Sequence, residues 1–153
     1  MNAIVFTFFI FLVMMKISLQ KVEIPPGGIH LALTAMLNGQ SVRMVLDTGA
    51  SRSVLDIDYF QELYPEANLK EELSDSAGVG ASGLASYTSW VDSFFIEGFE
   101  VKDYELALMD LSHVKESYNQ LGEETIYGVI GGDILERYEA IIDYSDFSLT
   151  LLD

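Results

Sequence analysis

The residues best suited to chemistry stand where an apolar segment ends in a carboxylate. This stretch, Val45–Gly49, reads Val-Leu-Asp-Thr-Gly, and Asp47 is its acid. Gly49 lets the backbone turn back close beneath the carboxylate, the Thr48 hydroxyl can hold the loop rigid, and the small Ala50–Ser51 pair lets another loop approach. A carboxylate that must be fixed in position and shielded from bulk water needs such a turn. The stretch therefore indicates a catalytic acid, with an ordinary Asx turn as the structural alternative.

A second apolar segment, late in the chain and ending in glycine, separates these two interpretations. Its residues are Val129, Ile130, Gly131 and Gly132. In their order and in their residues the two segments resemble those of the retropepsin-like aspartic proteases, and they resemble the bacterial single-domain members more than the viral ones. In that family the later segment crosses behind the catalytic loop and leads into a short helix and a final strand. The resemblance runs from about Ile17 to the end of the chain, and the two segments are its specific part.

The resemblance implies an all-β fold: a retropepsin-like acid protease barrel with short helices and one lobe per chain. It also implies an aspartic endopeptidase, in which two carboxylates share one proton and activate water against a peptide bond. One chain supplies a single Asp47, so the expected partner is a second copy that brings its own Asp47 into a homodimer. The substrate is expected to be an extended peptide or protein segment.

A mobile flap over the substrate is a further feature that the resemblance implies. The glycine-rich stretch between the two motifs stands where the flap is expected, and its residues are Gly78, Val79, Gly80, Ala81, Ser82 and Gly83. The three glycines also match the G-x-G-x-x-G dinucleotide-binding pattern. This pattern indicates nucleotide binding only when it lies between a strand and a helix. Because the following Ala85–Ile96 stretch is rich in aromatic residues and predicts a strand, nucleotide binding is rejected.

The rest of the sequence predicts short strands separated by turns. Strands are expected at Ile17–Ile24, Ile29–Leu37, Gln40–Leu46, Tyr87–Ile96, Phe99–Val101, Tyr104–Met109, Ile126–Ile130, Ala140–Asp143 and Ser148–Leu152. Helical segments are expected at Ile57–Leu63, Asn68–Leu73, Leu111–Leu121 and Asp133–Tyr138. Asn38–Gly39 is a strong hairpin signal because both residues tolerate positive φ. The hairpin spacing favours a closed or sandwiched all-β domain over a βαβ fold.

Composition excludes several classes of function. The chain has no cysteine, so disulfides, thiolate metal sites and a cysteine nucleophile are ruled out. Its 8 Lys and Arg against 24 Asp and Glu give a net charge of −16, which repels phosphates and argues against a nucleic-acid partner.

His30 and His113 lack the spacing of metal ligands, so no metal and no cofactor is expected. Ser51 has no evident histidine partner, Asp133 is expected to cap a helix or pair with an arginine, and Asp143 is expected to be a turn acid.

The N-terminal segment from Ala3 to Met15 is almost wholly apolar. Its length suits the core of a signal peptide and is short for a bilayer span, but no Lys or Arg precedes it and no cleavage pattern follows. Two interpretations stay open. If Met1 is the true start, this segment contacts a membrane or directs export. If translation begins at Met14 or Met15, the protein is expected to be cytoplasmic.

The expected division is therefore an apolar segment at residues 1–14 and one retropepsin-like protease domain at residues 15–153. Two functions from different classes remain. The first is peptide hydrolysis, and the second is a catalytically silent binding or dimerisation module on the same fold, free or tethered to a membrane. Replacing Asp47 by asparagine distinguishes them, because only the peptidase loses an activity.

Overall fold

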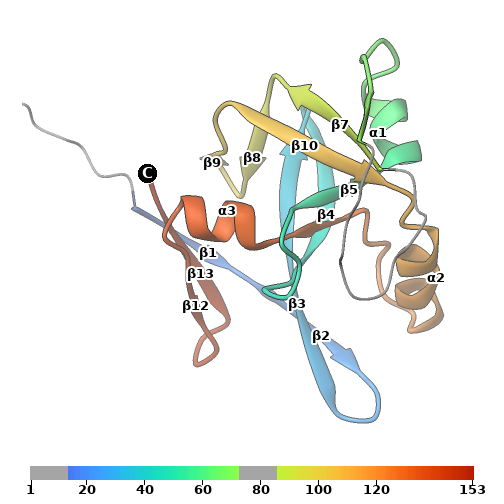
Figure 1. The fold of residues 1–153 in the computed structure, drawn as a ribbon. Coiled ribbons are helices and arrows are strands. Elements are labelled where there is room, and N and C mark those ends of the chain that lie inside the picture. The colour runs from blue at the N-terminus through green and yellow to red at the C-terminus, as the bar shows by residue number, and fades with distance from the viewer. Residues whose placement is uncertain (1–13, 73–85) are drawn as a thin grey trace, which may run out of the picture.

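The computed structural model describes residues 14–72 and 86–153, and these form a fold built mostly of short strands (Figure 1). The strands are β1 Met14–Ser18, β2 Gln20–Ile24, β3 Gly28–Leu37, β4 Gln40–Leu46, β5 Val54–Asp56, β6 Lys70–Glu72, β7 Ser86–Val91, β8 Phe94–Ile96, β9 Phe99–Glu100, β10 Tyr104–Met109, β11 Gly128–Ile130, β12 Ile141–Asp143 and β13 Ser148–Leu152. The helices within these ranges are α1 Ile57–Leu63, α2 Ser112–Gln120 and α3 Gly132–Arg137. The predicted all-β fold with short helices is confirmed.

The strands of the described residues form two sheets. The smaller sheet has the order β1-β13-β12, and the larger has the order β6-β7-β10-β5-β11-β4-β3-β8-β9, with β2 added to β3. Strand β11 pairs in parallel with β4 and antiparallel with β5. It therefore lies between the two strands that precede and follow the Asp47 turn.

One hydrophobic core serves both sheets. The alternation of β3 and β4 turns Leu33 and Met44 inwards at the same register position, and both are buried. Ile17 of β1 and Leu151 of β13 belong to the same core cluster, so the two ends of the described chain are fastened to its centre. A smaller cluster joins helix α2 to β2, β3 and β4, and its buried members are Val22, Ala32, Val45, Tyr118 and Ile126.

Two helices are linked through one buried carboxylate. Asp56 caps α1, because its Oδ1 accepts a hydrogen bond of 3.1 Å from the Tyr59 N–H. The same side chain accepts 3.0 Å from the Leu111 N–H and 2.7 Å from the Lys115 ammonium. The start of α2 is thus tied to the start of α1. Helix α2 ends as predicted before Gly122, which has φ of 74°.

The β2–β3 hairpin extends beyond the larger sheet as a two-stranded projection (Figure 1). Strand β4 pairs with β3 only from Leu31 onward, whereas β2 continues to pair along β3 to Gly28. At the opposite end of β3, the predicted Asn38–Gly39 hairpin is confirmed, with φ values of 48° and 73°.

Three predicted elements were wrong in detail. The predicted strand Ile17–Ile24 divides at Leu19, whose N–H donates to the Phe147 carbonyl over 2.7 Å, so β1 joins β13 while β2 joins β3. The segment Asn68–Leu73 was predicted as helical but contains strand β6, which pairs with β7. The predicted strand Tyr87–Ile96 divides into β7 and β8 because the first pairs with β10 and the second with β3.

The end of the apolar N-terminal segment belongs to the smaller sheet. Met14 and Met15 lie in β1 and pair with Leu152 and Leu151 of β13. Residues 1–13 lie outside the described part of the chain, so both interpretations of the start site remain predictions. Among the described helices, none is long and apolar enough to cross a membrane.

Candidate active site

Asp47 stands at the end of β4 on an exposed turn that hydrogen bonds hold in place. Its N–H donates to the Ile130 carbonyl over 3.0 Å, and its Oδ1 accepts from the Gly49 N–H over 2.8 Å. The Ala50 N–H donates back to the Asp47 carbonyl over 3.2 Å and closes the turn. The carboxylate is therefore open to solvent in the single chain, yet its position is fixed from two sides.

The segment Val129–Gly132 lies directly behind this turn. A Cβ added at Gly131 would stand 2.6 Å from the Arg52 carbonyl oxygen and 2.8 Å from that of Ala50, which is too close for any side chain. The Gly132 N–H donates to the same Ala50 oxygen over 2.7 Å. The two motifs are thus brought into contact, and the contact requires glycine at position 131.

A buried polar layer supports the turn from below, and the sequence analysis did not find it. The fully buried Ser53 accepts a hydrogen bond of 2.8 Å from the Gly131 N–H through its Oγ, and this hydroxyl donates to Asp133 Oδ1 over 2.7 Å. The Tyr104 hydroxyl donates to the other oxygen of Asp133. Burial, together with the hydrogen bond and charge of Asp133, raises the pKa of Tyr104 well above its ordinary value.

The prediction that Asp133 caps a helix or pairs with an arginine was wrong. The N-cap of α3 is Gly131. Asp133 lies in the first helical turn, where its carboxylate accepts hydrogen bonds from the hydroxyls of Ser53 and Tyr104. Asp143, in contrast, is an exposed turn acid as predicted, because its Oδ1 accepts from the Ser145 N–H over 2.8 Å.

A cavity of about 350 Å³ opens beside Asp47. Its walls come from the end of β4, from β3, from β11 and from one face of α2, and they are formed by His30, Val45, Leu46, Asp47, Val114, Ser117, Tyr118 and Val129. Half of these side chains are aliphatic, namely Val45, Leu46, Val114 and Val129. Among the described residues that line the cavity, Asp47 is the single carboxylate.

His30 and Tyr118 form the polar side of this cavity. His30 Nδ1 and the Tyr118 hydroxyl share a hydrogen bond of 2.6 Å. Burial raises the pKa of Tyr118, Arg43 opposes this shift, and the charge of Asp47 adds to it. His30 is exposed, and within residues 14–72 and 86–153 no group of His, Asp and Glu side chains could hold a metal ion.

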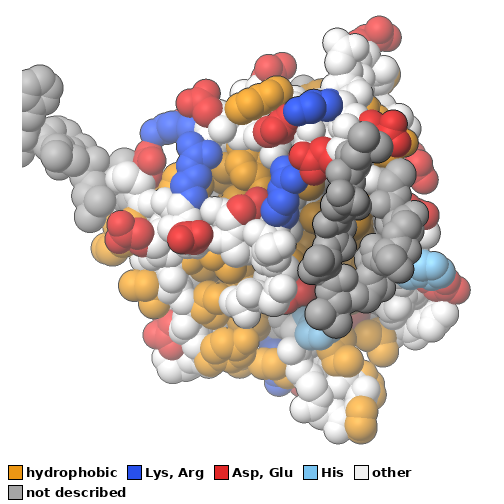
Figure 2. Space-filling view, viewed as in Figure 1, with side chains coloured by type: hydrophobic (Ala, Val, Ile, Leu, Met, Phe, Trp, Pro, Cys, Tyr) orange, Lys and Arg blue, Asp and Glu red, His pale blue; other side chains and the backbone are white. Residues whose placement is uncertain are grey.

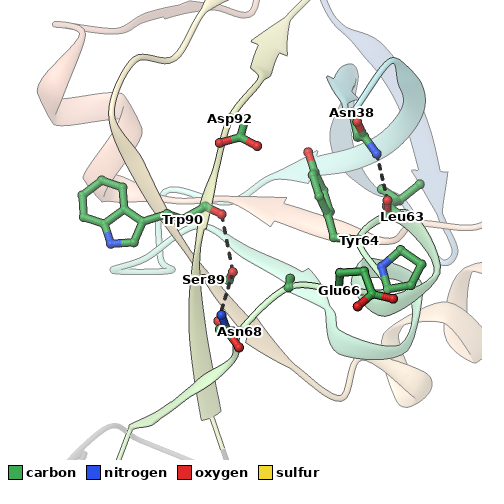
Figure 3. A pocket seen from close by; sticks show the side chains of 10 residues that line it. Asn38, Leu63, Tyr64, Glu66, Asn68, Ser89, Trp90 and Asp92 are labelled. Atoms are coloured by element: carbon green, nitrogen blue, oxygen red, sulfur yellow. Dashed lines mark hydrogen bonds between the residues drawn. The ribbon is translucent and has the colours of Figure 1, made fainter.

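A larger cavity, of about 540 Å³, shares no lining residue with the one beside Asp47 (Figure 3). In Figure 3 the Trp90 ring points away from Tyr64 and Asn38, which lie on the other side of the cavity. Its acids, Glu66 and Asp92, are exposed and accept no hydrogen bond from other described side chains. Because no carboxylate is held here on a fixed turn, the cavity beside Asp47 is the better candidate for chemistry.

The remaining predicted site residues are placed as follows. Thr48 and Ser51 are exposed in the single chain, and Ala50 is partly buried beneath the turn. The predicted flap, Gly78–Gly83, lies outside the described residues.

An all-β chain with an exposed Asp-Thr-Gly carboxylate, backed by an apolar segment ending in glycine, defines the acid-protease class of fold. Comparison with known proteins agrees with this class. The sequence pattern of the family described as "Aspartyl protease" matches residues 33–134, which is most of the chain. The protein belongs to this family and has the retropepsin-like fold and a protease-type function.

Solved structures with the same fold come from bacterial, protozoan and viral sources. The chain is similar to a retropepsin-like aspartic protease from Rickettsia conorii, with 20% identity, a TM-score of 0.55 and coverage of 92% of this chain and 90% of that one. It is similar to the retroviral protease-like domain of Ddi1 from Leishmania major, with 16% identity, a TM-score of 0.53 and coverage of 80% and 87%. The EIAV protease in complex with the inhibitor HBY-793 gives 18% identity, a TM-score of 0.50 and coverage of 76% and 93%. Among curated proteins, none matches the chain.

Proposed function

We propose that this protein is an aspartic endopeptidase in which Asp47 and the Asp47 of a second copy form the catalytic pair. The observation that carries the proposal is the exposed carboxylate on a fixed turn, beside an apolar cavity whose described walls contain no second acid. A lone carboxylate of this kind lacks the partner that the chemistry needs. A two-fold axis beside the turn supplies that partner from an identical surface.

The chemistry follows from two carboxylates that share one proton. The ionised carboxylate takes a proton from water while the water oxygen attacks the carbonyl carbon, and the protonated carboxylate gives its proton to the carbonyl oxygen. A tetrahedral diol results. Its collapse returns a hydroxyl proton to a carboxylate, transfers a proton to the amide nitrogen and breaks the C–N bond. Like charges about 3 Å apart do not both ionise readily, so the pair starts with one proton.

The cavity indicates what the substrate presents to the site. Its wall of Val45, Val114 and Val129 suits an apolar side chain next to the bond that is cut. We therefore propose a peptide or protein substrate bound in extended form. Because the core cluster runs from Ile17 to Leu151, residues 15–153 are proposed to act as one domain.

The test compares Asp47→Asn with Asp143→Asn. Both aspartates are exposed, and each accepts a hydrogen bond of 2.8 Å from the N–H two residues further on, so both substitutions disturb a similar local turn. Hydrolysis of an unstructured protein substrate should disappear in Asp47→Asn and persist in Asp143→Asn, with both variants folded by circular dichroism. Cleavage by Asp47→Asn at the wild-type rate contradicts the proposal, and a wild-type dimer that never cleaves favours a binding module.

Mixing the two chains tests whether the pair is shared. If wild-type and Asp47→Asn subunits exchange, only dimers with two wild-type chains keep both carboxylates. Activity should then fall with the square of the wild-type fraction. A linear fall would mean that each chain works alone, which contradicts a shared pair.

A further inference from the structure

The larger cavity of Figure 3 is joined by a second one that shares part of its wall. This second cavity, of about 520 Å³, opens between the end of β7 and the loop before β10, and its walls are formed by Trp90, Val91, Asp92, Phe94, Glu100, Val101, Lys102 and Asp103. Trp90 and Asp92 line both cavities, whereas Asp47 lines neither. We call the lining of the two cavities together the Trp90 surface.

The walls of the larger cavity are attached to the core of the molecule. The Asn38 side chain, on the β3–β4 turn, donates a hydrogen bond of 2.8 Å to the Leu63 carbonyl at the end of α1. The Tyr64 ring stacks on the fully buried Phe60, with ring centroids 4.8 Å apart. The volume of about 540 Å³ lies within the range of about 300–1,000 Å³ that is typical of ligand sites. The cavity is therefore preformed and large enough for a side chain of a partner.

The Tyr64 hydroxyl is an unsatisfied polar group in the wall of this cavity. Its oxygen is buried and, among the described residues, forms no hydrogen bond. Burial raises the pKa of Tyr64, the charge of Asp92 adds to this shift, and the nearby Asn38 N–H opposes it. In Figure 3 the hydroxyl points into the space between Asp92 and Asn38. Because buried hydroxyls normally have a partner, the wall lacks a hydrogen-bonding group at this point.

The acids of the larger cavity have no basic side chain of the chain as a partner. Glu66 and Asp92 are both exposed. All eight Lys and Arg residues lie in the described part of the chain, and six of them form ion pairs, none with Glu66 or Asp92. Lys70 and Arg137 remain, and neither lines the Trp90 surface. Lys102, the single Lys or Arg that lines it, already belongs to one of these ion pairs.

Trp90 adds a large aromatic face to these carboxylates. It is 66% exposed on β7, and the exposed Glu100 and Asp103 line the second cavity on its other side from Glu66. Figure 2 shows acidic side chains, with a few basic ones between them, along the upper edge of the molecule, where Figure 1 places β7. Arginine and lysine cations bind over the face of a tryptophan ring, and arginine also pairs with a carboxylate through two N–H groups. The surface therefore suits cationic side chains.

We propose that the Trp90 surface is a docking site for a basic segment of another protein, whose arginine or lysine side chains bind at Glu66 and Asp92 while the segment crosses Trp90. Carboxylates without a counter-charge favour a cation, and two cavities that share one wall fit neighbouring side chains of a peptide better than one compact ion. The net charge of −16 also attracts a basic segment from a distance. The inference goes beyond the proposed peptidase, because this surface contains no part of the candidate active site.

The first experiment uses the fluorescence of Trp90, the only tryptophan of the sequence. The probe is a pentapeptide of alternating arginine and glycine, and its control carries glutamine in place of arginine. The arginine peptide should change the emission of Trp90 and reach saturation, whereas the glutamine peptide should leave it unchanged. Binding of the arginine peptide without a change in emission would place it elsewhere and overturn the proposal. An equal response to spermidine would mean a site for small cations and would overturn it as well.

The second experiment compares Asp92→Asn with Asp143→Asn. Both aspartates are exposed, and each substitution removes one negative charge, so the two variants differ only in where the charge is lost. By calorimetry, the dissociation constant of the arginine peptide should rise about fivefold in Asp92→Asn and by less than about twofold in Asp143→Asn. Equal weakening in both variants would mean that the peptide responds to the total charge of the chain, which overturns the proposal.

The third experiment compares Trp90→Leu with Tyr144→Leu. Tyr144 is an exposed aromatic residue between β12 and β13, at 61%, and it lines neither cavity of the Trp90 surface. Because leucine keeps an apolar surface but has no aromatic face, calorimetry should show the arginine peptide bound about threefold more weakly by Trp90→Leu. Tyr144→Leu should bind it like the wild type. Unchanged binding by Trp90→Leu would contradict the role of the aromatic face and overturn the proposal.

A final control separates docking from the proposed peptidase, because the candidate active site is a competing place for any peptide. Asp47→Asn should bind the arginine peptide as tightly as the wild type does. Loss of binding in this variant would assign the peptide to the cavity beside Asp47 and overturn the docking proposal, while the peptidase proposal stands. Retained binding supports docking even if the wild type hydrolyses nothing, so the two proposals fail independently.

Discussion

At the scale of single residues, the site depends on a backbone approach that admits no side chain. Gly131 passes so close behind the Asp47 turn that its missing Cβ sets the distance between the two motifs. At Gly132, one residue further, a Cβ would stand 3.4 Å from the Ala50 oxygen, which is ordinary contact. Neighbouring glycines therefore have different roles: Gly131 leaves no room for a side chain, whereas Gly132 holds the turn through its N–H, which an alanine would keep.

We expect Gly131→Ala to destabilise the fold by about 1–3 kcal/mol and to reduce hydrolysis sharply, because the added methyl pushes the turn away from β11. Gly132→Ala lies in the first turn of α3 and should leave stability unchanged or raise it by up to about 1 kcal/mol. Urea denaturation of both variants measures the difference. Equal stability of the two would show that the close approach relaxes freely.

Ser53 is the second residue on which the turn depends, because its hydroxyl connects Gly131 to Asp133. Ser53→Ala leaves a buried N–H and a carboxylate oxygen without this partner, and we expect a loss of about 1–3 kcal/mol in the free energy of unfolding. The exposed Ser112→Ala should change it by less than about 0.5 kcal/mol. A Ser53→Ala variant as stable as Ser112→Ala would contradict this role.

The sequence predicted Asp47 and Val129–Gly132 because each motif is contiguous and can be recognised from adjacent residues. The roles of Ser53 and Tyr104 could not be predicted from the sequence. A single serine or tyrosine carries no local pattern, and Ser53 meets Gly131 across 78 positions of sequence. Such a role becomes visible only when the topology has brought β5, β10 and α3 together.

At the scale of elements, the placement of α2 matters because this helix forms one wall of the cavity beside Asp47. The helix is held by the ion pair of Lys115 with Asp56, whose side chains are 22% and 1% exposed. Burial alone would lower the pKa of Lys115, but its hydrogen bond to Asp56 and the charges of Asp56, Asp58 and Asp110 outweigh burial and raise it.

Lys115→Met should destabilise the protein by about 3–5 kcal/mol, because it leaves Asp56 buried without its counter-charge. Lys102→Met removes an exposed pair with Asp153, and we expect a change of less than about 1 kcal/mol. Thermal or urea unfolding of the two variants provides the comparison. If both variants lose the same small amount of unfolding free energy, the buried ion pair does not hold α2 in place.

The raised pKa of Lys115 also predicts how stability depends on pH. Above its ordinary pKa of 10.5 the unfolded chain releases the proton while the folded chain retains it, so the stabilisation falls as pH rises through the folded value. It is fully present below pH 10.5. Wild type should therefore lose stability more steeply than Lys115→Met above this pH. Parallel curves for the two proteins would contradict the assignment.

The presence of a strand was easier to predict than the residue at which a predicted strand divides into two. Gln40–Leu46 was predicted with its observed bounds because the Asn38–Gly39 hairpin signal precedes it. Ile57–Leu63 was predicted with its observed bounds because a capping residue, Asp56, precedes it and a proline, Pro65, follows it. No local sequence signal indicates the break at Leu19 between β1 and β2. It arises because β1 finds its partner in β13 at the far end of the chain, and alternation alone does not reveal a change of partner.

At the scale of the whole molecule, the proposed dimer must bring together two chains of net charge −16. Salt screens charges separated by more than about 8 Å at physiological ionic strength, and mild acid neutralises carboxylates. Dimerisation should therefore tighten with added salt and on lowering the pH towards about 5. Sedimentation across both series measures this. A dimer that weakens with salt would mean that attraction between charges dominates the contact.

The hydrogen bonds around Asp47 have a consequence for when the proposed activity can begin. The turn is fastened to the carbonyl of Ile130 and to Gly132, so a chain emerging from the ribosome contains the acid long before it contains the residues that immobilise it. Contacts this distant in sequence form late in folding. Under the proposed function, the unfinished polypeptide is therefore expected to be inactive, and hydrolysis is expected only after synthesis has passed α3 and two completed chains have met.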